Sequence, residues 1–208
     1  AGDNGFNGIF VQGGQIWAVG YMSNTNGQSM KDAAYMVFDA NCGPLSWYSL
    51  RSLLNKWMLD DEGMSIAVTA NYICVVGSTT VVNSKDALIW IIPRNGGSES
   101  YTTKGTANQF DCAYTVGVDD NTPAYFYWGG CLYSTQSQTD DAFISKVNSV
   151  TTVESWTKRA NSNLQNQIRS LSVDGTGQNQ YIYTAGWSKN VNNPQKTDII
   201  LKKYKTDG

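Results

Sequence analysis

The sequence predicts an all-β fold, a four-bladed β-propeller in which each blade is an antiparallel sheet of four strands and the last blade lacks its outer strand. Three observations predict it. One sequence unit occurs four times along the chain. Each unit contains short runs of β-branched and aromatic residues. Glycine, asparagine and aspartate occupy the turns between these runs. Only residues 53–59 show a pattern that fits a helical turn.

Two markers recur at matching intervals and define the unit. An apolar run ends in glycine four times, at intervals of 57, 52 and 57 residues: Gly20, Gly77, Gly129 and Gly186. After a polar loop, an aspartate opens a second apolar run, at intervals of 54, 55 and 57 residues: Asp32, Asp86, Asp141 and Asp198. Two markers with the same period indicate a repeat architecture.

Further runs complete each unit. One run precedes the glycine marker in every unit, at 8–12, 64–69, 112–118 and 169–173, and another follows the aspartate run in three units, at 45–51, 98–104 and 152–159. We therefore expect a single domain, 1–208, with approximate repeats 1–60, 61–109, 110–165 and 166–208. Stacking each sheet between two neighbours buries both of its apolar faces, which favours closure into a ring.

The unit resembles the repeats of extracellular β-propeller proteins, which are commonly built of seven blades. The segment Asp141-Ala142-Phe143-Ile144-Ser145-Lys146 carries this resemblance most clearly. The resemblance implies a propeller fold and a secreted or surface-attached protein. This chain has four units rather than seven.

The fourth unit ends before its outer strand. Three explanations stay open: a last blade of three strands, a chain that is a piece of a larger propeller, or a strand donated by another molecule. The edge run at 199–205 carries three lysines. Lysines on an edge strand usually disfavour its pairing with a strand of another molecule. Self-association through this edge is one expectation.

Composition excludes several functions. The chain has 208 residues, and its 15 Lys+Arg against 17 Asp+Glu give a net charge of −2, so we expect no nucleic-acid partner. It contains no apolar run long enough to span a membrane and no basic-then-apolar leader, so we expect a secreted protein whose signal has been removed. Histidine is absent, which excludes Ser-His and Cys-His catalysis and histidine-ligated metals. We expect no metal and no cofactor.

Four cysteines allow three pairings. Cys112 and Cys131 are placed at similar distances from the turn at 119–123, so the hairpin predicts a Cys112–Cys131 disulfide. A Cys42–Cys74 disulfide between neighbouring blades is the second prediction. Four buried thiols are the alternative.

The positions of the acidic residues favour a structural role over a catalytic one. We interpret Asp32, Asp86, Asp141 and Asp198 as structural residues that accept backbone hydrogen bonds at the start of a strand. A glycosidase would need two carboxyl groups on one rim, one of them with a raised pKa. The acid clusters at 60–62 and 119–120 fall in predicted turns, where solvated side chains are expected.

Aromatic residues beside Asn-, Gln-, Ser- and Thr-rich loops suit sugar recognition. The loops at 22–31, 79–85, 132–140 and 188–197 share one rim. The candidate ligand-binding residues are Trp57, Tyr133, Trp187 and Asn190.

These observations predict a non-catalytic extracellular interaction or structural module, not an enzyme, that assembles through strand donation to its incomplete last blade. A lectin that binds glycans through the loop rim is the first alternative. A glycoside-active enzyme is the second.

Overall fold

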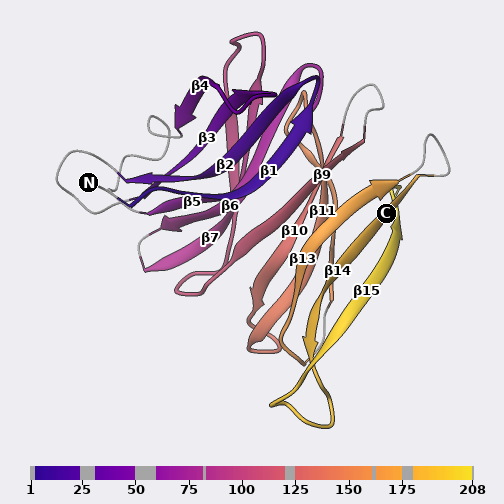
Figure 1. Cartoon of the computed structure of the whole chain (residues 1–208). Helices are drawn as coiled ribbons and strands as arrows, with labels where there is room; N and C mark the ends of the chain where they lie inside the picture. The colour runs from indigo at the N-terminus through magenta and orange to yellow at the C-terminus, as the bar shows by residue number, and fades with distance from the viewer. Residues whose placement is uncertain are drawn as a thin grey trace.

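The computed structural model describes residues 3–23, 31–49, 60–81, 83–119, 125–160, 163–174 and 180–207. These residues form four antiparallel sheets, each a series of sequential hairpins, which we call blades 1 to 4 (Figure 1). Blade 1 holds β1 (Gly5–Gln12), β2 (Gln15–Ser23), β3 (Lys31–Asp39) and β4 (Pro44–Ser49). Blade 2 holds β5 (Asp61–Val68), β6 (Tyr72–Val81), β7 (Ser84–Pro93) and β8 (Ser100–Lys104).

Blade 3 holds β9 (Cys112–Asp119), β10 (Tyr125–Ser134), β11 (Thr139–Asn148) and β12 (Glu154–Arg159). Blade 4 has three strands, β13 (Asn166–Asp174), β14 (Tyr181–Lys189) and β15 (Thr197–Lys205). The all-β, propeller-like fold and the three-stranded last blade are therefore confirmed. The helical turn expected at 53–59 lies outside the described residues.

Each inner strand (β1, β5, β9 and β13) carries a β-bulge beside a glycine of the second strand. At Gly77, a Cβ atom would lie 1.8 Å from the carbonyl oxygen of Glu62 in the inner strand, so only glycine permits this approach. The same contact, at 1.9 to 2.0 Å, occurs at Gly20, Gly130 and Gly186. The equivalent glycine of the third unit is therefore Gly130, one residue after the predicted Gly129.

Three apolar clusters join consecutive blades. Trp17 and Tyr35 of blade 1 pack with Trp90 of blade 2 in the first cluster. The second cluster joins blades 2 and 3, and the third joins blades 3 and 4 through residues such as Ile144 and Ile168. The core of the molecule therefore lies between blades, where stacking removes apolar sheet faces from water.

The outward faces of the two end blades are exposed. On blade 1, Ile9 is 70% exposed, and on blade 4, Ile199 is 91% exposed. In Figure 1, β15 lies on the far side of the molecule from blade 1. We expected stacking to cover both faces of every blade, but it covers both faces only in blades 2 and 3.

The structure contradicts both predicted disulfides, because all four cysteines are free thiols. Cys112 and Cys131 do lie opposite each other in the β9–β10 register. Their sulfurs contact different groups: Cys112 Sγ lies 3.5 Å from the carbonyl oxygen of Ala113, and Cys131 Sγ lies 3.7 Å from the Tyr114 hydroxyl.

The Cys42–Cys74 disulfide fails for a topological reason. Cys42 is exposed in the turn after β3, whereas Cys74 is buried in the cluster between blades 2 and 3. The Cys74 side chain therefore points away from blade 1, where Cys42 lies.

Among the described residues, no helix is long and apolar enough to cross a bilayer.

Candidate functional site

Functional groups gather where the four inner strands begin, an end of the blades that we call the entry rim. The second strand of each blade also ends here, and the third begins here, because the strands run antiparallel. The entry rim therefore contains both the repeated aspartates and the residues that start each inner strand.

Polar residues at the entry rim tie neighbouring blades together. The Asp111 N–H donates to the Lys85 carbonyl of blade 2 at 2.6 Å, and the Asp111 carboxylate accepts the N–H of Thr106 at 2.6 Å. At the next junction, Asn166 Oδ1 of blade 4 accepts the N–H of Ala142 in blade 3 at 2.6 Å. These bonds fix the starts of β9 and β13 against the preceding blade.

Asp61 occupies the corresponding position at the junction of blades 1 and 2. It is 6% exposed, and Asp32 of blade 1 is 7% exposed. Burial raises the pKa of Asp61 to about 6, a hydrogen bond with the Thr79 hydroxyl opposes the rise, and the charges of Asp32 and Asp60 add to it. The junction thus holds two buried carboxyl groups from different blades.

Glu62, the next residue in β5, is tied to blade 1. Asn7, the residue at the β1 bulge, donates its Nδ2–H to Glu62 Oε1 at 3.3 Å and to the Gly63 carbonyl at 2.9 Å. The β1–β5 contact therefore positions a third carboxylate at the entry rim.

The Asp32–Asp61 pair can separate acid from base. A carboxyl group with a pKa near 6, such as that of Asp61, keeps its proton for part of the time near neutrality. Such a pair can donate a proton to one atom of a substrate and stabilise positive charge on another.

The predicted binding residues occupy separate places. Trp57 lies outside the described residues. Tyr133 lies near the end of β10, and its N–H donates to the Asp111 carboxylate. Trp187 lies in β14 opposite Ile199, on the outward face of blade 4. Asn190 follows β14, and its side chain donates to Asp198 Oδ2 at 2.8 Å and accepts the N–H groups of two residues in its own loop.

The four repeated aspartates have unlike surroundings. Asp86 Oδ1 accepts the Ser84 hydroxyl at 3.3 Å, and Asp198 accepts Asn190 as above. Asp141 is 1% exposed, and its Oδ1 has no hydrogen-bond partner. Their structural role stays a prediction.

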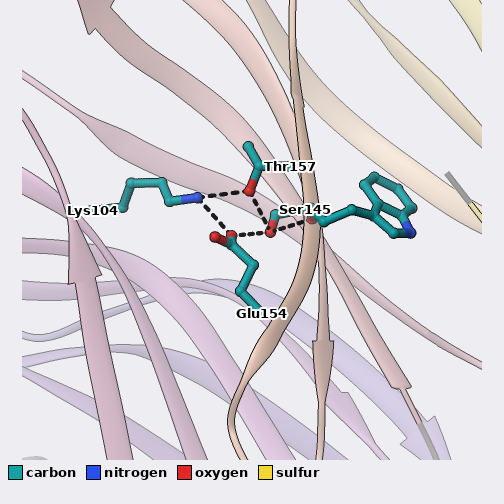
Figure 2. Close-up of polar contacts among 5 residues, drawn as sticks. Lys104, Ser145, Glu154 and Thr157 are labelled. Atoms are coloured by element: carbon teal, nitrogen blue, oxygen red, sulfur yellow. Dashed lines mark hydrogen bonds and ion pairs between the residues drawn. The ribbon is translucent and has the colours of Figure 1, made fainter.

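A second polar cluster joins blades 2 and 3 (Figure 2). Lys104 Nζ lies 2.6 Å from Glu154 Oε1 and 2.8 Å from the Thr157 hydroxyl, and the Ser145 hydroxyl donates to the same Glu154 oxygen. We call the ion pair the Lys104–Glu154 brace.

The brace is built for structure. Burial raises the pKa of Glu154, but hydrogen bonds from Lys104, Ser145 and Thr157 outweigh it and lower the pKa below its ordinary value. The two charged groups of the brace are therefore partners of each other across blades 2 and 3. Among the described residues, no group of three Cys, Asp or Glu side chains is arranged to hold a metal ion.

Sequence reasoning missed Asp61, which it placed with solvated turn acids. One signal could have found it: Asp61, Asp111 and Asn166 precede the inner-strand bulges at similar spacing, so all three belong to buried junctions. A shared position in the repeat outweighs the local appearance of a turn.

No protein-family model matches the sequence, and neither does any curated protein sequence. Several solved structures are similar in fold. A GH43 endo-arabinanase from Bacillus licheniformis has a TM-score of 0.49 and 9% identity, over 98% of this chain and 73% of that one. An exo-1,5-alpha-L-arabinanase from a bovine ruminal metagenomic library has a TM-score of 0.44 and 10% identity, over 96% and 74% of the two chains. An ACO/RPE65 chimera has a TM-score of 0.44 and 8% identity, over 92% and 46%.

These neighbours correct two expectations. Two of the three are named as arabinanases, which are enzymes, so the predictions of a non-catalytic module and of no enzymatic activity are contradicted. At 8 to 10% identity the likeness itself concerns the fold, and any activity must be argued from this chain's own residues.

Proposed function

We propose that the protein hydrolyses glycosidic bonds at the entry rim, with Asp61 as the proton donor and Asp32 as the second carboxyl group. One observation carries the proposal: Asp61 is buried, its pKa is raised to about 6, and the charge of a second buried carboxyl group, Asp32, adds to that rise. At the junction of blades 3 and 4, Asn166 holds the inner strand without a charge. A junction can therefore hold its inner strand without an acidic residue, so the Asp32–Asp61 pair is not needed for that purpose alone.

Glycoside hydrolysis uses two carboxyl groups in different protonation states. Asp61 protonates the leaving-group oxygen as the glycosidic C–O bond breaks, and Asp32 stabilises the positive charge that develops on the sugar ring. A water molecule then adds to the anomeric carbon and returns a proton to Asp61. Asn7 holds Glu62 at the same rim, where its carboxylate can accept hydrogen bonds from sugar hydroxyls.

Other groups at the entry rim suit a sugar. The Lys31 ammonium lies 3.8 Å from the centroid of the Tyr21 ring, close to Asp32 in the same hairpin. An aromatic face beside hydrogen-bonding groups supports sugar contact. Tyr133, Trp187 and Asn190 stay predicted sugar contacts, and secretion stays a prediction from composition.

The test is turnover of a panel of aryl glycosides and of pentose and hexose polysaccharides. We expect the wild-type protein to release product from at least one substrate. Asp61→Asn and Asp32→Asn should each lower kcat/KM by about a hundredfold or more, because each removes a group that acts in the transition state.

Asp198→Asn is the matched control, since Asp198 has the same place in its strand as Asp32 but lies on the exposed last blade. It should keep wild-type turnover. Full activity in Asp61→Asn, or no turnover of any substrate by the wild-type protein, would refute the proposal.

A further inference from the structure

A pocket opens between blades 1 and 2 at the end of the blades opposite the entry rim. Its volume is about 360 Å³, and the residues that the argument uses are Gln15, Trp17, Tyr35, Ser46, Arg94 and Glu99. We call it the interblade pocket. β2 begins here and β7 ends here, so the pocket is separated from Asp61 by the length of the strands.

Aromatic rings form one wall of the interblade pocket. The centroids of the Trp17 and Tyr35 rings lie 6.2 Å apart, and those of Tyr35 and Trp90 lie 5.8 Å apart. All three side chains are nearly fully buried in the cluster between blades 1 and 2. Of the three, Trp17 and Tyr35 line the pocket, and Leu45 and Pro93 add apolar surface to it.

Two charged side chains of opposite sign border this wall, and each is held in place. The Arg94 guanidinium lies 5.2 Å from the Trp17 ring centroid, and its Nη1 donates to the Thr69 carbonyl at 3.0 Å. Glu99 Oε2 accepts the Trp90 Nε1–H at 2.8 Å. Preorganised side chains lose little entropy when a ligand binds.

From this arrangement we propose that the interblade pocket binds a neutral saccharide of one or two rings. A sugar has an apolar C–H face to lie on the aromatic wall, and hydroxyls that accept from Arg94 and Gln15 and donate to Glu99. Arg94 and Glu99 carry opposite charges that cancel, so the pocket has no net charge to attract a charged ligand, and its donors and acceptors suit a neutral polyol. The volume falls in the range of small-molecule sites. This inference does not rest on the proposed hydrolytic activity.

The test is isothermal titration of the full chain with xylobiose, cellobiose, maltose and lactose, with glucuronic acid and glucosamine as charged comparators. We expect saturable binding of at least one neutral disaccharide at concentrations up to about 10 mM, the weak range of binding free energies. Glu99→Gln and Arg94→Gln should each weaken that binding by about tenfold, the equivalent of about 1.4 kcal/mol.

Both residues are exposed on the loop after β7, so these variants should fold. Lys158→Gln and Asp174→Asn remove exposed charges elsewhere and should bind as the wild type does. Asp61→Asn should also bind normally, which separates this site from the proposed catalytic centre. Absence of saturable binding, equal binding in both pocket variants, or preference for a charged sugar would overturn the proposal.

Discussion

At the scale of single residues, Asp61 imposes a pH dependence on stability. Its pKa in the folded protein is about 6, above the ordinary value of 3.8, so the folded state binds a proton more tightly than the unfolded state does. Stability therefore falls as the pH rises from about 4 to above 6. The full shift corresponds to about 3 kcal/mol, an upper limit for the cost at high pH.

We therefore expect Asp61→Asn to be more stable than the wild type at pH 8, by about 1 to 2 kcal/mol, and to lose activity. The gain should vanish near pH 4, where the wild-type carboxyl is protonated. Urea unfolding at both pH values measures it. A variant that is destabilised equally at both pH values would indicate that the carboxylate serves the junction instead.

Gly77 makes a second prediction at this scale. An added Cβ would lie 1.8 Å from the Glu62 carbonyl oxygen, a distance that the backbone can relieve only by moving β5. Gly77→Ala should lose about 3 kcal/mol or more of unfolding free energy, as for other overpacked sites. Gly97→Ala is the control, because its nearest contact is a flexible Asn95 side chain at 3.2 Å. Thermal unfolding of both variants decides the point.

At the scale of elements, the Lys104–Glu154 brace is one of the polar contacts that join strands of neighbouring blades. It connects the end of β8 to the start of β12, outside the apolar cluster between blades 2 and 3. Both side chains are partly exposed, so solvent screens the pair and its contribution is modest.

Lys104→Met should lower stability by about 1 kcal/mol at pH 7, because the Glu154 carboxylate loses its partner. Since the pKa of folded Glu154 is lowered, the brace stabilises above the ordinary value of 4.5 and is lost as the pH falls below it. The difference between variant and wild type should therefore shrink at pH 3. Lys158→Met, an exposed change on β12, should show no such pH dependence in the same unfolding titration.

The elements were also the best predicted part of the molecule. Apolar runs and marker glycines predict all fifteen described strands, because those signals depend on local spacing. Three features depend instead on which side chains face which blade. They are the burial of Asp61, the interblade pocket and the free thiol of Cys112. Local sequence cannot report that, so a buried carboxyl was interpreted as a solvated one and an opposed pair of thiols as a disulfide.

At the scale of the whole molecule, stability is unequal along the stack. Blades 2 and 3 are covered on both faces, whereas the outward faces of blades 1 and 4 meet solvent. Local opening should therefore cost less free energy in the end blades. Whether β15 pairs with another chain through 199–205 stays a prediction.

Hydrogen exchange read by mass spectrometry tests this gradient. Peptides covering β6, β7 and β10 should exchange most slowly, and those covering β14 and β15 most quickly. Equal protection across the four blades would contradict the assignment of the cores to the spaces between blades.

The glycine–bulge contact has a consequence for how such a chain can change over generations. Each contact is completed inside a single unit, and each apolar cluster involves only two consecutive units. Duplication or loss of one whole unit would thus leave every remaining joint chemically intact. Lineages that carry this architecture can lengthen or shorten by whole modules, while a change of a few residues inside the bulge is far harder to tolerate.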